Sequence, residues 1–171
     1  MIKYIFILLI GFLLPVTTGC TDTNLTHDIP LVPRPAHLVP GSGNYLFSDK
    51  TVFVVENEEQ AAVAASLISR FTNAAGFTPK LVVGATEKGD VRFVTDASLK
   101  SEAYSLEVSP EEIIVKASGD KGFFYALQTI RQLLPASIER ESLSDKKEKW
   151  SIPAMNVQDE PRFEYRALLL D

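Results

Sequence analysis

Apolar residues follow two different spacings after residue 29, and each spacing predicts a different kind of element. A continuous apolar run over residues 51–55 and a shorter one over residues 91–94 are typical of buried strands. Over residues 103–117 apolar and polar positions alternate on both sides of Ser109-Pro110, which predicts an antiparallel hairpin with its turn there. These segments are expected to form one sheet.

Two stretches have the three- and four-residue spacing of amphipathic helices. The first is expected to begin at Asn57, an N-cap with Gln60 three residues later, and to end at Gly76. The second is expected over residues 120–134, and Pro135 ends it. Because strands exceed helices and the hairpin is antiparallel, the pattern predicts an α+β fold, a small sheet with two helices packed on one face.

The first 28 residues have the pattern of an export signal. Lys3 precedes an apolar run over residues 4–14, which is too short to span a membrane comfortably, and small residues then lead to Cys20, the only cysteine. This arrangement resembles a bacterial lipoprotein signal, in which residues 1–19 are removed, Cys20 is lipidated and residues 20–28 form a tether. The alternative is an ordinary secretory signal with an incidental thiol. Either way the protein is expected to be exported, and the lipid would anchor it in the periplasm or at the cell surface.

Composition narrows the classes of function. The chain has 17 basic against 22 acidic residues, a formal charge of −5, which argues against a nucleic-acid partner. His27 and His37 lie in no metal-ligand pattern, and the sequence has neither a Gly-rich phosphate loop nor a Gly-x-Ser-x-Gly motif. No metal, cofactor or serine nucleophile is therefore expected.

The last third of the chain changes in character. Residues 136–149 are charged and are interpreted as a solvated linker. Asp159-Glu160 is interpreted as a turn before Pro161. The run from Arg166 through three leucines to Asp171 is typical of a strand buried on both faces, as in parallel sheets covered by helices. Such a strand needs partners, so the chain is expected to be a fragment whose second domain continues past Asp171.

Two segments carry a resemblance to a known family. Residues 122–134 are similar to the helix of the small N-terminal domain of glycoside hydrolase family 20, the β-N-acetylhexosaminidases, and residues 152–171 resemble the lead into the first strand of their catalytic barrel. The resemblance, which Val32-Pro33-Arg34-Pro35 also fits, implies two parts. Residues 29–149 would form the α+β domain and its linker, and residues 150–171 would begin a truncated (β/α)8 barrel. The related O-GlcNAc-removing hydrolases share the helix but not the Arg-x-x-x-x-Asp tail.

The resemblance also implies an activity. Family members remove terminal β-linked N-acetylglucosamine or N-acetylgalactosamine from glycans by substrate-assisted retaining hydrolysis, with an adjacent Asp-Glu pair on a later barrel strand. That pair is absent here, so the chain is expected to hold no catalytic residue and to be inactive alone. Arg166 matches the arginine that binds the hydroxyls of the terminal sugar; from the residues alone, a structural partner of Asp171 or another carboxylate is the alternative. The role of Asp171 stays open.

Two further interpretations complete the expectations. Trp150 is expected to anchor an interface between domains, because it lies where the linker meets the next strand. A hypothesis of a different class is a complete, non-catalytic surface lipoprotein that binds glycan or a partner enzyme. The sequence predicts no oligomeric state.

Overall fold

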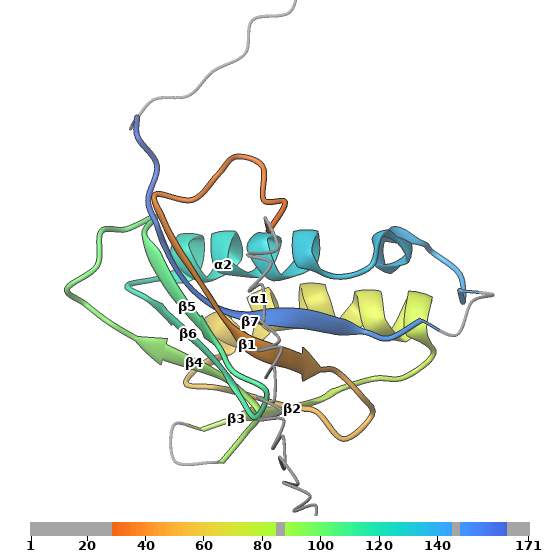
Figure 1. Ribbon diagram of the computed structural model, residues 1–171. Helices are drawn as coiled ribbons and strands as arrows, with labels where there is room; N and C mark the ends of the chain where they lie inside the picture. The colour runs from red at the N-terminus through yellow and green to blue at the C-terminus, as the bar shows by residue number, and fades with distance from the viewer. Residues whose placement is uncertain (1–28, 85–87, 145–147, 164–171) are drawn as a thin grey trace, which may run out of the picture.

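The computed structural model describes residues 29–84, 88–144 and 148–163, which form a seven-stranded mixed sheet with helices on one side (Figure 1). In chain order the elements are β1 (His37–Leu46), β2 (Val52–Val55), α1 (Glu58–Arg70), β3 (Lys80–Val83), β4 (Val91–Thr95), β5 (Tyr104–Val108), β6 (Ile113–Ala117), α2 (Asp120–Leu133) and β7 (Ser151–Asp159). A π-helical turn, Phe71–Ala75, continues α1, and a short 3-10 helix, Ala136–Glu139, follows α2.

The strand order across the sheet is β1-β7-β5-β6-β4-β2-β3. β5 and β6 form the antiparallel hairpin that the alternating pattern predicted, in register from Tyr104 opposite Ala117 to Val108 opposite Ile113. Strands β6, β4, β2 and β3 are parallel to one another, and α1 makes the crossover between β2 and β3. The parallel half was not expected from the sequence, because spacing predicts a strand but not its partner.

Both helices begin and end close to where their sequence signals place them. The Asn57 side chain accepts a hydrogen bond from the Gln60 N–H at 2.9 Å and caps the start of α1. Gly76 follows the π-helical turn with φ 75°, the left-handed conformation that glycine adopts most readily. Helix α2 runs over Asp120–Leu133, so the expected helix at 120–134 is confirmed.

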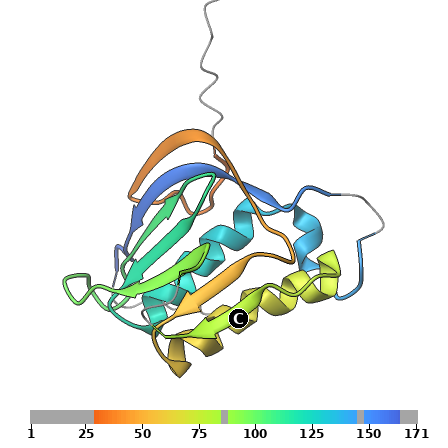
Figure 2. The ribbon, with the colours of Figure 1, turned by 90° about the horizontal axis from the view of Figure 1, so that it is seen from below.

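Both helices cover the same face of the sheet, which curves around them in Figure 2. Alternate residues of the strands point into this layer and are fully buried, and the rings of Phe93 on β4 and Phe123 on α2 stack at 5.0 Å between centroids. The opposite face carries polar side chains, including the cross-strand ion pair of Lys116 and Glu107 at 2.7 Å. The predicted α+β fold with two helices on one sheet face is confirmed.

Strand β7 places the domain boundary later than the sequence suggested. Residues 150–171 were assigned to a second domain, but Ser151–Asp159 lies between β1 and β5, and it pairs with β1 over residues 151–158 and with β5 over residues 155–159. Ile152, Met155 and Val157 on this strand are buried in the same core as the rest of the sheet. The α+β domain therefore extends at least to Asp159.

The segment after α2 contacts the domain at several points, so its interpretation as a solvated linker is wrong at those points, although most of its described side chains are exposed. Ile138 in the 3-10 helix is 1% exposed, and Glu139 binds Arg131 of α2 and Arg70 of α1. The Ser144 N–H donates to the carbonyl of Ala74 at 2.9 Å. A charged sequence thus covers the ends of both helices.

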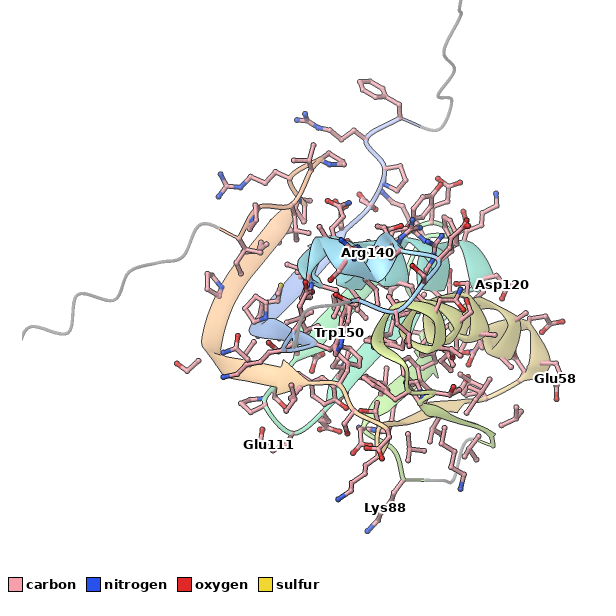
Figure 3. The ribbon with its side chains drawn as sticks, turned by 90° about the vertical axis from the view of Figure 1, so that its right-hand side faces the viewer. Glu58, Lys88, Glu111, Asp120, Arg140 and Trp150 are labelled. Carbon is pink, nitrogen blue, oxygen red and sulfur yellow. The ribbon has the colours of Figure 1, made fainter. Side chains whose placement is uncertain are left out.

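Trp150 belongs to the domain core. Its side chain is 7% exposed and meets the ring of Phe71 edge-on, at 6.3 Å between centroids, while its carbonyl accepts from the Phe47 N–H. In Figure 3 it lies inside the fold, whereas Lys88 and Glu58 lie at the periphery. The interpretation as an interdomain anchor is wrong, because Trp150 immediately precedes β7 and its side chain packs in the core of this domain.

Candidate functional site

Two segments that are far apart in sequence meet at one end of the sheet. We call residues 29–36 the N-terminal arm and residues 160–163 the C-terminal arm. Strand β1 runs antiparallel to β7, so the N-terminal arm enters the sheet where the C-terminal arm leaves it. The orange and blue segments at the upper left of Figure 1 are these arms.

The N-terminal arm is fixed on α2 and on the sheet. Leu31 is 7% exposed, and the Val32 N–H donates to the Gln132 side-chain oxygen at 3.1 Å. Farther along, the Ala36 N–H donates to Asp159 Oδ1 at 3.0 Å. Hydrogen bonds to side chains therefore hold the arm at its middle and at its end.

Asp159 is the last residue of β7 and ends the β1–β7 ladder. The last pair in that ladder is His37 with Gln158, and the next main-chain bond is replaced by the bond from Ala36 to the Asp159 carboxylate. A carboxylate acceptor makes a stronger bond than a neutral carbonyl. The interpretation of Asp159-Glu160 as a turn is wrong for Asp159, which lies within the strand.

Glu160 follows Asp159 and pairs with a different part of the chain. Its Oε1 lies 2.9 Å from Lys100 Nζ, on the loop before β5. The Lys100 side chain is 78% exposed, so solvent screens the pair and its contribution to stability is below about 1 kcal/mol. Both carboxylates of this acidic pair are therefore engaged within the domain.

A buried tyrosine lies beneath the two arms. The Tyr104 hydroxyl is hydrogen-bonded to the Thr129 hydroxyl at 2.6 Å, and the Thr129 hydroxyl also lies 3.3 Å from the carbonyl oxygen of Tyr125. Burial raises the pKa of Tyr104 to about 12, the bond to Thr129 opposes that rise, and the Asp159 charge adds to it. Tyr104 thus stays protonated near neutral pH and is suited to packing rather than to acid–base catalysis.

The arms and α2 enclose a hollow of about 420 Å³. Its walls come from the N-terminal arm, from α2 and from the C-terminal arm; they include Arg34, Tyr125, Gln128, Arg162 and Phe163. Phe163 is 71% exposed, and its ring forms part of the rim. The hollow combines apolar walls with two guanidinium groups. Its three carboxylates, from Glu102, Asp159 and Glu160, each contact another group of the domain.

The predicted site residues divide into those the structure places and those it does not. Arg166 and Cys20 lie outside the described residues, so their predicted roles stay predictions. Gln128, interpreted as a packing partner, accepts a bond from Arg131 at 3.1 Å. Sequence reasoning missed Gln132 and Lys100, because their partners come from distant segments and nothing near them in sequence indicates those partners.

Within the described ranges no three His, Cys, Asp or Glu side chains come together in a way that could hold a metal ion. No helix in that part of the chain has the length and apolar character to cross a membrane.

Comparison with protein families gives a match over nearly all of the described chain. Residues 28–160 match the family described as glycosyl hydrolase family 20, domain 2. The matched range ends one residue after β7, which agrees with the later boundary that the sheet indicates.

Individual relatives give the same result. The chain is 29% identical over 146 residues to a β-hexosaminidase of Porphyromonas gingivalis, covering 84% of this chain and 18% of the relative. It is 28% identical over 149 residues to a β-N-acetylhexosaminidase of Cellulomonas fimi, covering 84% of this chain and 28% of that protein. The chain thus spans less than a third of the length of either relative.

A solved structure shares both sequence and fold. The N-acetyl-β-hexosaminidase of Streptomyces plicatus, determined in complex with Thio-NAglucal, is 27% identical with a TM-score of 0.70. The alignment covers 77% of this chain and 26% of that one. The α+β domain is therefore similar to one part of a longer enzyme.

Proposed function

The chain belongs to glycosyl hydrolase family 20, and from that premise we propose that it forms the non-catalytic domain of a β-N-acetylhexosaminidase. Such an enzyme removes terminal β-linked N-acetylglucosamine or N-acetylgalactosamine from glycans. The observation that carries the proposal is the family match over residues 28–160, with relatives that are hexosaminidases. The tail supports it further, since Arg166 and Asp171 stand where the resemblance puts the first barrel strand.

The proposed chemistry is substrate-assisted hydrolysis. The acetamido oxygen of the substrate attacks the anomeric carbon as the bond to the leaving oxygen breaks, and water then opens the cyclic intermediate with net retention. An Asp-Glu pair polarises the acetamide and protonates the leaving oxygen. The only adjacent Asp-Glu in this sequence is Asp159-Glu160, whose carboxylates hold Ala36 and Lys100 instead. We therefore expect no turnover by the 171 residues alone.

Arg166 is the residue of this chain to which the proposal gives a role in substrate binding. A guanidinium carries several N–H donors in a fixed plane, which suits the neighbouring hydroxyl oxygens of a sugar ring. Because these bonds are made to substrate and transition state alike, losing them raises KM more than it lowers kcat.

The test is hydrolysis of a chromogenic β-N-acetylglucosaminide. The complete product of the reading frame is expected to release the chromophore, and the purified 171-residue chain is expected to match a mock preparation. In the complete product, Arg166→Ala is expected to raise KM about tenfold or more. The KM of Arg166→Lys is expected to lie between those of the unsubstituted protein and Arg166→Ala, because lysine keeps the charge but lacks the planar donors. An inactive complete product would overturn the proposal and favour a non-catalytic binding lipoprotein. Turnover by the short chain would also contradict it.

The proposal includes a location. The pattern of residues 1–20 supports export and a lipid on Cys20, which would hold the domain at a membrane surface in the periplasm or outside the cell. Labelling of cells with a radioactive fatty acid is expected to mark the protein and not its Cys20→Ser variant. Equal labelling of both would exclude Cys20 as the attachment point.

A further inference from the structure

The hollow between the two arms and α2 has a chemical character that the proposed hydrolysis does not use. Its volume of about 420 Å³ lies within the range of about 300–1,000 Å³ that small-molecule sites have. Every residue that lines it belongs to the described part of the chain, and most of the wall is apolar. Its polar groups therefore decide which kind of ligand it suits.

The carboxylates of the hollow are already engaged. Glu102 Oε1 lies 3.6 Å from Lys121 Nζ, so a lysine balances its charge. Glu160 Oε1 lies 2.9 Å from Lys100 Nζ in the same way. The third carboxylate, Asp159, accepts a main-chain N–H of the N-terminal arm at 3.0 Å. None of the three is thus left to a ligand as an unoccupied acceptor group.

The two guanidinium groups of the hollow are in the opposite state. Arg34 comes from the N-terminal arm and Arg162 from the C-terminal arm, and within the described ranges neither makes a hydrogen bond or an ion pair. By contrast, Arg70, Arg92 and Arg131 each pair with a glutamate. With the two lysines that balance its carboxylates, the hollow has four basic against three acidic groups. It is a locally positive site on a chain of net charge −5.

Two amides of α2 add further donors. The side-chain oxygen of Gln132 accepts the Val32 N–H, and that of Gln128 accepts from Arg131. Neither Nε2 group has an acceptor within the described ranges, and both side chains line the hollow. The donors without acceptors are thus planar guanidinium and amide groups. Planar donors of this kind bind the paired oxygens of a carboxylate or sulfate group.

Aromatic rings supply the other half of the site. Tyr125 of α2 and Phe163 of the C-terminal arm both line the hollow, and Phe163 is 71% exposed. A pyranose has an apolar C–H face, which packs on an aromatic ring, and a polar edge, which takes hydrogen bonds. A small inorganic anion makes no use of such rings. The combination therefore fits a sugar ring that carries an anionic group.

We propose that the hollow is an accessory binding site for an acidic sugar, a pyranose with a carboxylate or a sulfate group. Arg34 and Arg162 bind the anionic group, and Phe163 packs on the sugar ring. This inference rests on the proposed hexosaminidase function for the nature of the ligand, and it deepens that function. The substrates are then glycans in which acidic sugars accompany the terminal hexosamine.

The experiment is a ligand-observed NMR titration of the purified 171-residue chain with glucuronate, glucose 6-sulfate and glucose. Glucuronate has a carboxylate where glucose has a CH₂OH group, so the two sugars form a matched pair. A monosaccharide is expected to bind here with a Kd of about 1 mM. Glucose is expected to bind at least about tenfold more weakly, because it lacks the group that the guanidiniums bind. The tighter of the two acidic sugars identifies the anionic group.

Substitutions locate the site on the domain. Arg34→Ala and Arg162→Ala are each expected to weaken glucuronate binding about tenfold, and Phe163→Ala about threefold. All three side chains are exposed, so these changes do not threaten the fold. Arg92→Ala is the matched control: this arginine lies on the opposite face of the sheet and pairs with Glu112 at 3.1 Å. It is expected to leave the Kd unchanged.

The outcomes separate this inference from the function on which it rests. Equal binding of glucose and glucuronate, or equal binding of acetate and glucuronate, would overturn the acidic-sugar site. So would a Kd that Arg34→Ala and Arg162→Ala leave within twofold, or that Arg92→Ala raises as much. Binding by the 171-residue chain but not by the complete product of the reading frame would also overturn it, because the hollow would then be covered. If the complete product binds glucuronate but hydrolyses no N-acetylglucosaminide, the proposed function fails and the binding site stands.

Discussion

Gly122 shows how one residue sets the distance between a helix and the sheet. A Cβ at this position would lie 2.4 Å from the carbonyl oxygen of Ala103 and 2.8 Å from the Cβ of Ala117 on β6. Backbone atoms cannot move aside as a flexible side chain can. The absence of a side chain at Gly122 therefore allows the start of α2 to approach the sheet closely.

Gly122→Ala is expected to destabilise the domain by about 1–3 kcal/mol, the usual cost of overpacking a core. Helix propensity alone would favour alanine by about 1 kcal/mol, so the sign of the change distinguishes the two effects. Urea unfolding of the unsubstituted protein and of Gly122→Ala measures the change in the free energy of unfolding. A gain in stability would contradict the close approach of α2 to the sheet. Gly119→Ala, which has open space around its Cβ, is the matched control.

Glu139 gives the domain a stability that depends on pH. Its bonds to Arg131, aided by the charge of Arg70, hold the pKa of its carboxyl below the ordinary value of 4.5. A carboxyl whose pKa is lower in the folded than in the unfolded protein stabilises the folded state. This contribution is complete at pH values above the unfolded pKa and is lost as the pH falls through the folded pKa. The side chain is 44% exposed, so the contribution is below about 1 kcal/mol.

Glu139→Gln is therefore expected to unfold at a lower temperature than the unsubstituted protein at pH 7, with the difference shrinking steadily below pH 4.5. Thermal melts across that range measure it. Glu111→Gln, at the turn between β5 and β6, controls for the loss of any one carboxylate. If the two proteins differ in unfolding temperature by the same amount at pH 7 and at pH 3.5, the charge of Glu139 is not the cause of the difference.

At the scale of elements, local signals predicted α1, α2 and the hairpin, but not the edges of the sheet. Strand β1 contains Pro40 and Gly41, which weaken any strand signal. The structure accommodates them at an edge, where the register with β7 shifts between Pro40 and Asn44. The assignment of β7 to a second domain has a related cause, since only pairing across the chain shows which sheet a strand joins.

The place of β7 has a consequence for folding. Ile152, Met155 and Val157 are at most 1% exposed, and burying three such side chains contributes about 5–9 kcal/mol as an upper estimate. That is comparable with the whole stability of a typical domain, about 5–15 kcal/mol. Removing β7 would also leave β1 without the strand that it pairs with.

A chain of residues 29–149, the domain predicted from sequence, is therefore expected to lack a cooperative unfolding transition, whereas residues 29–163 are expected to unfold in one step. Circular dichroism during heating measures both, and residues 29–171 serve as the reference for the longer chain. Similar midpoints for the short and long chains would show that β7 is dispensable.

At the scale of the whole molecule, the fold brings the two arms together at one surface. The sequence predicted the family resemblance and the candidate Arg166, because motifs carry that information directly. It did not predict that Ala36 and Asp159 meet, since 123 residues separate them and the contact depends on β1 pairing with β7. The contact between the two arms thus follows from the topology of the sheet, whereas the candidate sugar-binding residue follows from local sequence.

The most direct test of the proposed function compares two chromogenic substrates with the complete product of the reading frame, a β-N-acetylglucosaminide and the matching β-glucoside. The glucoside has no acetamido oxygen to attack the anomeric carbon. An internal nucleophile held in position accelerates reaction by several orders of magnitude, so the N-acetylglucosaminide is expected to react at least about 1,000-fold faster. Comparable rates on the two substrates, or turnover of neither, would contradict the assignment of this chain to a substrate-assisted hexosaminidase.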